Sequence, residues 1–292
     1  MSELSEKSIQ ILELPQVLTM LAGCAVTEEG KEKSLTLRPM TDIDDIQRAQ
    51  DETSAAVKML ILRGSPGFSG VKPVAASLQR ADMGGSLSTR ELTDVAAVLR
   101  AARTAGDYGA SQEKSPISHL FQALTPNRFL EERITNSILG EDEIADSASP
   151  ELASIRRHMR AAEAKVRDIL QRLISSNQSK YLQESIITIR SDRYVVPVKS
   201  EHKNAIPGLV HDVSSSGSTF FIEPMGVVKA NNELRELAAK EKKEIERILA
   251  ELSADCAAHK EDILEDYQLI VWLDTIFARA QLSLKLECSE PK

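Results

Sequence analysis

The sequence HDVSSSGSTFFIEP, residues 211–224, differs from the rest of the chain. Small polar residues and Gly217 lead into a short apolar run that ends at Glu223 and Pro224. The residues before this stretch favour strands, and the residues after it favour one long charged helix. A chain rich in helix formers therefore carries one small β-region between two long helices, and the arrangement of these three parts decides the fold.

Composition is typical of a globular protein. The chain has 292 residues, of which 42% are hydrophobic, 27% charged and only 4% aromatic. Abundant Ala, Leu, Glu, Lys and Arg favour helices, and the length predicts about two domains. The net charge of −8 argues against a uniformly cationic nucleic-acid binder, so any such contact requires a local basic patch.

Cysteine use and the N-terminus indicate a cytoplasmic protein without a membrane partner. Cys24, Cys256 and Cys288 lack metal-ligand spacing and are expected to be reduced thiols. The first residues, MSELSEKSIQILELP, do not resemble a secretion signal, and no run is long and apolar enough to span a membrane. The five histidines are scattered, and the acidic cluster at residues 141–143 is expected to be a solvated loop, so we predict no metal site.

Helical patterns dominate the first 125 residues. The apolar spacing predicts three helices, at 8–23, 27–37 and 42–63. Thr41 or Asp42 is the expected N-cap of the third helix. Ser88 and Glu91 form a capping-box sequence that begins a further helix, through about residue 104. We interpret residues 1–125 as a helical core.

Two longer helical patterns follow. Residues 151–174 carry apolar side chains at alternating spacings of three and four, which is typical of a coiled-coil seam. The seam positions are Leu152, Ile155, Met159, Ala162, Val166, Ile169 and Leu173. Residues 226–266 show a second long pattern, which at ~1.5 Å per residue would span roughly 60 Å.

The two long patterns carry opposite charge. Residues 150–182 hold seven Lys and Arg against three Asp and Glu, whereas residues 227–268 hold seven against eleven. We expect them to pair antiparallel, with the apolar seam supplying stability and the charge selecting the partner. The predicted fold is mainly α, a helical bundle core with a long antiparallel two-helix lever that carries a small antiparallel β clamp at its tip. Its parts are the core at 1–125, outgoing lever helices at 126–182, the β clamp at 183–225, a returning lever helix at 226–266, and a helix returning to the core at 267–292.

Residues 184–223 change to a strand pattern. The runs ESIITIR, RYVVPVKS, PGLVHDV and STFFIEP are short and rich in β-branched or aromatic residues, so we predict four strands. Pro197 lies inside the second run and indicates an edge strand or a bulge there. Phe220 and Phe221 point to opposite faces, so at least one should pack against the helices, while the other is free to pack or to stack on a base.

These residues resemble a known family. The run ESIITIRSDRYVVPVKSEHKNAIPGLVHDVSSSGSTFFIEPMGVVKANNELRELAAKEKKEIERIL is similar to the clamp and returning lever of the second bacterial branch of the MutS family, often called endonuclease MutS-two. LRPMTDIDDIQRAQDETSAAVKML, RGSPGFSGV and ADMGGSLSTRELTDVAAVLRAAR resemble its core domain. The resemblance covers nearly the whole chain and is most specific between residues 184 and 235.

The resemblance implies partners and cofactors for a longer parent protein. No phosphate-binding loop G-x-x-x-x-G-K-[ST] is present; the nearest approach, Gly23 with Gly30 and Lys31, has the wrong spacing, and Glu32 replaces the required hydroxyl. ATP and Mg²⁺ would therefore serve an ATPase domain outside these residues, as would cleavage by a nuclease domain and most of the homodimer contact. We expect no catalytic residue and no cofactor within residues 1–292.

Three functions stay open. The family resemblance implies a clamp for branched or recombination-intermediate DNA that suppresses homologous recombination. It also implies, as an alternative, an arm that contacts ribosomal RNA on stalled or collided ribosomes. The third alternative is a purely structural coiled-coil scaffold. Because the net charge is negative and the dimer domain would lie elsewhere, we expect residues 1–292 alone to bind nucleic acid weakly or not at all.

The candidate nucleic-acid-binding residues lie in the predicted clamp. They are Arg190, Arg193, Lys199 and Lys203. Strand alternation puts Arg193 and Lys199 on one face. Against a basic patch, residues 183–225 hold four basic and five acidic groups, so phosphate contacts and solvated strand charges both remain possible.

The other polar residues of the clamp are expected to be structural. Neighbouring strand residues point to opposite faces, so His211 and Asp212 should not form a catalytic pair with a serine. The predicted turn residues are Asp212, Ser214, Ser216, Gly217, Glu223 and Pro224, with side chains bonding backbone amides and Gly217 supplying the turn conformation.

The outgoing helix presents a further basic group. Its members are Arg156, Arg157, Arg160 and Arg167. They could line a nucleic-acid channel, although ion pairing with the acidic returning helix is the simpler interpretation.

Overall fold

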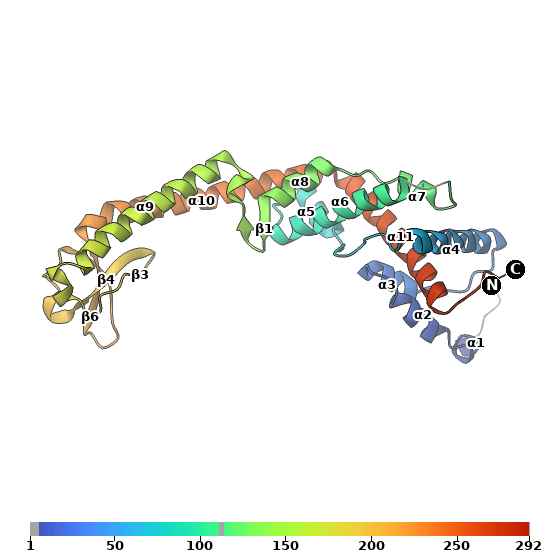
Figure 1. Cartoon of the computed structure of the whole chain (residues 1–292), viewed down its shortest axis with the longest axis horizontal. Coiled ribbons are helices and arrows are strands. Elements are labelled where there is room, and N and C mark those ends of the chain that lie inside the picture. The colour runs from blue at the N-terminus through green and yellow to red at the C-terminus, as the bar shows by residue number, and fades with distance from the viewer. Residues whose placement is uncertain (1–5, 111–113, 292) are drawn as a thin grey trace. The chain divides into compact units, whose positions relative to one another are not determined.

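The computed structural model describes residues 6–110 and 114–291 (Figure 1). The chain forms two compact units: unit 1 comprises Met1–Glu143 with Leu249–Lys292, and unit 2 comprises Ile144–Ile248. Helices predominate in both units, as the composition predicts.

Unit 1 is helical. Its helices are α1 (Glu6–Ile11), α2 (Leu14–Ala22), α3 (Glu28–Leu35), α4 (Ile43–Arg63), α5 (Ala75–Asp82), α6 (Thr89–Ala110), α7 (Ser118–Gln122), α8 (Arg128–Ser137) and α11 (Lys260–Lys285). The apolar helix α11 packs against α4, α6, α3 and α2. Phe277 of α11 is buried, with its ring centroid 6.3 Å from that of Phe68 and 6.0 Å from that of Tyr108. Helix α11 therefore packs among the helices of unit 1.

Local capping follows the sequence. Asp42 accepts hydrogen bonds from the backbone N–H groups of Asp44 and Asp45 at the start of α4, each at 3.0 Å. At α6, the Ser88 N–H donates to Glu91 Oε2 at 3.0 Å and the Glu91 N–H donates to Ser88 Oγ at 3.3 Å, which forms the predicted capping box.

Helix α6 runs past the predicted end, because burial outweighs local composition. Ala105 is only 1% exposed, and Tyr108 packs on Phe121 and Phe277, so the turns that contain two glycines stay helical. The predicted loop 105–116 is therefore helical at its start, and its residues 111–113 lie outside the described residues.

Two long predicted helices are interrupted. The helix expected at 8–23 divides at Leu12 and Glu13, where Glu13 is left-handed (φ 53°) and Pro15 in the first turn of α2 has no N–H to continue the preceding helix. The helix expected at 226–266 is divided into two helices: α10 (Met225–Ala258) ends before His259, and α11 begins at Lys260. Glu261 and Asp262 in the first turn of α11 favour a helix start there.

The units also differ from the predicted parts. Unit 2 begins at Ile144, so α8 lies in unit 1 rather than in an outgoing lever. The boundary at residues 248 and 249 lies inside α10, which therefore contributes to both units. The short strands β1 (Ile138–Gly140) and β2 (Glu143–Ile144) pair with each other where the chain leaves unit 1.

Unit 2 combines α9 (Pro150–Ile174), the first part of α10 and a four-stranded sheet. The two helices run antiparallel: Ser149 at the start of α9 bonds to Glu244, whereas Ile169 near its end lies against Gly226. The strands are β3 (Thr188–Arg190), β4 (Arg193–Lys199), β5 (Gly208–Val213) and β6 (Thr219–Pro224), as predicted in number. They pair antiparallel in the order β3-β4-β6-β5.

One hydrophobic cluster joins the helices of unit 2 to the sheet. Its buried members are Ala162, Val166, Leu170, Leu182, Val196, Val198, Ile206, Ile222, Val227, Ala230 and Leu234. They come from α9, α10, β4, β6 and the connecting segments, with Phe220 partly buried against them. Leu170, absent from the predicted seam, is fully buried, whereas Ile169 and Leu173 are only partly buried. Sheet and helix pair therefore share a single core, and Figure 1 shows β4 and β6 beside the end of α9.

Pro197 does not mark an edge strand. β4 lies between β3 and β6, but β3 pairs only with Arg193–Val195. The Pro197 carbonyl accepts a hydrogen bond from the Gln183 N–H at 2.9 Å. In an antiparallel strand, the N and the C=O of one residue point to the same side. The N–H that Pro197 lacks would therefore face the Gln183 segment, and the hydrogen bonds between β4 and β6 stay intact. The bulge of the sheet is at His211 in β5, where the register shifts between Val210 and Asp212.

Glu91 gives unit 1 a pH-dependent contribution. The Arg80 guanidinium holds the pKa of Glu91 at about 2, below its ordinary 4.5. Because the folded pKa is lowered, this stabilisation is complete above about pH 4.5 and is lost as the pH falls toward 2. We expect Glu91→Ala to lower the free energy of unfolding of unit 1 by about 1 kcal/mol at pH 7, with a smaller difference at pH 3, measured by urea unfolding.

The control is Glu132→Ala. The Glu132 side chain is 54% exposed and pairs with Arg128, so its loss should change stability little at either pH. An equal cost for Glu91→Ala at pH 7 and pH 3 would contradict the assignment.

Candidate nucleic-acid interface

The two faces of the sheet have different chemistry. Val196 pairs with Ile222 on the face that joins the hydrophobic cluster. Alternation places Arg193, Phe221 and Glu223 on the opposite face. Both arginines proposed from the sequence lie on this second face, because Arg190 pairs directly with Arg193 across β3 and β4.

Glu223 is the centre of a buried polar cluster. Its side chain is 0% exposed. Both of its oxygens accept hydrogen bonds from Arg193 Nη1, at 2.8 and 2.9 Å. His211 Nε2 lies 2.6 Å from Glu223 Oε2, and Asn231 Nδ2 of α10 donates to Oε1 at 2.7 Å. A buried carboxylate with this many partners connects β4, β5, β6 and α10, so Glu223 has a wider structural role than the turn predicted for it.

Arg193 is therefore committed to internal contacts. Its side chain is 14% exposed, and Nη2 also donates to Asn232 Oδ1 at 2.7 Å. The sequence suggested a phosphate contact, but in the structure the charge is compensated by Glu223. The pairing was not visible in the sequence because the two residues are thirty positions apart.

The other three proposed cations also have protein contacts. Arg190 lies over the Phe221 ring at 4.2 Å, and its Nε is 3.3 Å from Asp212 Oδ2. Lys203 Nζ is 4.7 Å from the Phe220 ring centroid, and Lys199 Nζ donates to the Lys180 carbonyl at 3.3 Å.

The four cations do not form one patch. Arg190 pairs with Arg193 near the start of β4, whereas Lys199 is at its end, roughly 20 Å away at ~3.3 Å per residue. Phe221 is covered by Arg190 and Phe220 by Lys203, so each aromatic ring already stacks on a cation.

The turn between β5 and β6 is closed by its own residues. Gly217 has φ 70°, a conformation that favours glycine, and its N–H donates to the Ser214 carbonyl at 2.8 Å. Ser214 Oγ accepts from the Thr219 N–H at 3.1 Å. Ser216 Oγ bonds to Ser218 Oγ rather than to an amide, and Asp212 Oδ1 accepts from the Val213 N–H. No serine of this turn bonds to a histidine among the described residues, and Pro224 ends β6 immediately before α10.

Helix α9 keeps most of its basic side chains exposed. Arg156 pairs with Glu241 of α10 at 2.7 Å, as the simpler sequence interpretation expected. Arg160 pairs instead with Asp146, at 3.1 Å. Arg157 and Arg167 are exposed and have no ion pair within residues 6–110 and 114–291. The expected pairing with the returning helix therefore holds for one arginine of the four.

Charge is divided between the two units. Unit 2 holds 17 Lys and Arg against 14 Asp and Glu, a net charge of +3. Unit 1 holds 19 against 30, a net charge of −11. Most of the eleven acidic residues at 227–268, the predicted returning helix, lie after residue 248 and so belong to unit 1. The overall charge of −8 thus conceals a unit that is attractive to polyanions.

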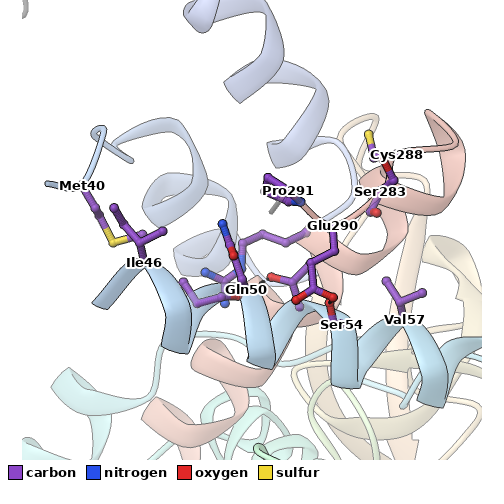
Figure 2. Close-up of a pocket in the computed structure, with 13 residues that line it drawn as sticks. Met40, Ile46, Gln50, Ser54, Val57, Ser283, Cys288, Glu290 and Pro291 are labelled. Carbon is purple, nitrogen blue, oxygen red and sulfur yellow. Dashed lines mark hydrogen bonds between the residues drawn. The ribbon is translucent and has the colours of Figure 1, made fainter. Parts of the chain in front are cut away.

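The described residues include no metal cluster and no helix long and apolar enough to cross a membrane. Figure 2 shows a pocket of about 360 Å³ in unit 1, between α4, the end of α11 and the residues after it. Arg279 Nη2 donates to Glu52 Oε2 at 2.8 Å, and Ser54 Oγ donates to Glu290 Oε2 at 3.0 Å. Its lining contains no histidine.

A structural role for Arg193 can be tested by mutation. Arg193→Ala leaves Glu223 buried without its main counter-ion, so we expect the free energy of unfolding of unit 2 to fall by about 3–5 kcal/mol, measured by urea unfolding. The matched control is Arg190→Ala. Arg190 is 40% exposed, and its removal should cost less than about 1 kcal/mol. Equal, small costs for both variants would show that Arg193 is free for phosphate.

Comparison with known proteins places the chain in a family. No protein-family model matches it. It is similar to proteins named endonuclease MutS2: 44% identical over 294 residues in Ruminiclostridium cellulolyticum, 44% over 294 residues in Acetivibrio thermocellus and 45% over 291 residues in Pelotomaculum thermopropionicum. Each comparison covers 99% of this chain and 37% of the relative. The chain thus spans less than half of the length of these relatives. Because the likeness extends along almost all of its residues, the chain belongs to the MutS2 family.

Proposed function

We propose that this chain is the DNA-binding portion of a MutS2-type protein that binds branched or recombination-intermediate DNA and thereby suppresses homologous recombination. The observation that carries the proposal is the charge division, in which unit 2 is +3 within a chain of −8. Membership of a family whose relatives are named endonucleases supports a nucleic acid as the partner.

The charge division suggests how DNA would be oriented. Phosphates are attracted to unit 2 and repelled by unit 1, whose charge is −11. In the proposal, the α9–α10 pair acts as a lever and its sheet as a clamp on the duplex. ATP and Mg²⁺, the nuclease and most of the homodimer contact would belong to the remaining length of the protein, and nucleotide state would control the grip.

The proposal predicts salt-dependent binding by the full-length gene product. We expect a four-way DNA junction to be bound more tightly than a linear duplex of equal length, by fluorescence anisotropy. With about five phosphate contacts, affinity should fall roughly 10²- to 10³-fold between about 50 and 200 mM salt.

Two results would contradict the proposal. One is co-sedimentation of the gene product with ribosomes without affinity for the junction, which would indicate a ribosome-binding arm. The other is self-association with no binding to either nucleic acid, which would indicate a structural scaffold.

A further inference from the structure

The outward face of α9 is a continuous basic surface. Its members are Arg157, Arg160, Lys165, Arg167 and Arg172, all exposed. At 100° per residue they lie within about 90° of the direction opposite the buried seam of Ile155, Val166 and Leu170. Asp168 is the exposed acidic residue in the same sector. The surface runs about 22 Å along the helix at ~1.5 Å per residue.

Little of this charge is neutralised inside unit 2. Arg160 has an ion pair with Asp146, which is itself 45% exposed. Arg157, Lys165, Arg167 and Arg172 make no ion pair or side-chain hydrogen bond within the part of the chain that the structure describes. Five like charges on one helix face repel one another, so a polyanion that neutralises them would bind with release of counterions.

The outward face of α10 is different. Within unit 2, six exposed cations there alternate with three exposed carboxylates: Lys229, Arg235, Lys240, Lys242, Lys243 and Arg247 with Glu233, Glu236 and Glu246. Carboxylates therefore interrupt the α10 face more often than the α9 face, where Asp168 is the exposed acidic residue. The two faces have similar size and nearly equal numbers of cations, which makes α10 an internal control.

We propose that the α9 basic face binds the phosphate backbone of duplex DNA. This rests on the proposed function and assigns its contact surface to α9 instead of the strand residues. Four of the five cations are arginines, which hold phosphate oxygens through two parallel hydrogen bonds. A stretch of ~22 Å of duplex presents roughly 13 phosphates at one charge per ~1.7 Å, more than enough for five cations.

The composition of this face selects a duplex over a single strand. Helix α9 contains no Phe, Tyr or Trp, so it offers no platform for stacking unpaired bases. Ala161 and Ala164 are exposed between the cations, and their short side chains let the helix backbone approach closely. The ~12 Å major groove of B-DNA accommodates a helix, whereas the major groove of A-form RNA is deep and narrow, which favours DNA as the partner.

The test compares two quadruple variants of the full-length gene product. The first is R157Q/R160Q/R167Q/R172Q on α9, and the matched control is K229Q/R235Q/K240Q/K242Q on α10. Both remove four exposed cations from unit 2 and introduce glutamine, a good helix former. Binding to a linear DNA duplex and to an RNA duplex of the same sequence is measured by anisotropy across a salt series.

We expect the α9 variant to lose at least about ten-fold in DNA affinity and its slope of log K against log salt to decrease in magnitude by about 3 to 4. The control should lose less than about threefold. Should the α9 quadruple variant unfold, as reported by circular dichroism, R157Q/R167Q removes only side chains without ion pairs in the described chain and should lower the slope magnitude by about 2.

Four outcomes would overturn the inference. If the wild type binds DNA and the α9 variant binds it equally well, the α9 surface is rejected but the proposed function stays intact. Equal losses in both variants would indicate a general charge effect, and a loss confined to RNA would reject DNA as the partner. If the wild type binds no DNA at all, the proposed function itself fails, and the inference with it.

Discussion

The apolar seam between α9 and α10 is the interaction on which the rest of unit 2 depends. Val166 and Leu170 on one helix and Val227 and Ala230 on the other are almost fully buried, and the sheet adds Ile222 to the same cluster. A small sheet of short strands is stable when its hydrophobic face packs against another surface. The helix pair supplies that surface. The antiparallel arrangement also brings the chain back beside its starting point, so 105 consecutive residues form one compact unit.

Burial of the seam also decides where the charges go. A helix whose apolar side chains face its partner must direct its long cationic side chains outward, and α9 does this with Arg157, Arg167 and Arg172, which have no ion pair in the described chain. By contrast, the Arg193 side chain is only 14% exposed, so it requires a counter-ion in Glu223. The same residue type is thus exposed to solvent on α9 and part of a buried polar cluster in the sheet, and burial separates the two cases.

Much of the fold was predictable from local patterns. The 3–4 spacing located α9, the β-branched runs gave four strands, and Ser88 with Glu91 marked the start of α6. Each of these signals is carried by residues close together in the sequence. The features that could not be predicted depend on distant partners. The Glu223 cluster joins four elements, and Pro197 is tolerated in a central strand because β3 pairs only with Arg193–Val195 and stops short of it. The break at His259 has no proline or glycine to announce it, and the unit boundary within α10 has no local signal.

The central claim, that the sheet is held by the helix seam as one cooperative core, can be measured by hydrogen exchange with Val166→Ala. Val166 is 0% exposed and lies on α9, but its cluster includes Ile222 of β6 and Val227 of α10. If the core is shared, the amides of β4 and β6 should lose protection together with those of α9 and of the first part of α10. Loss of protection confined to α9, with the strands unchanged, would contradict the account.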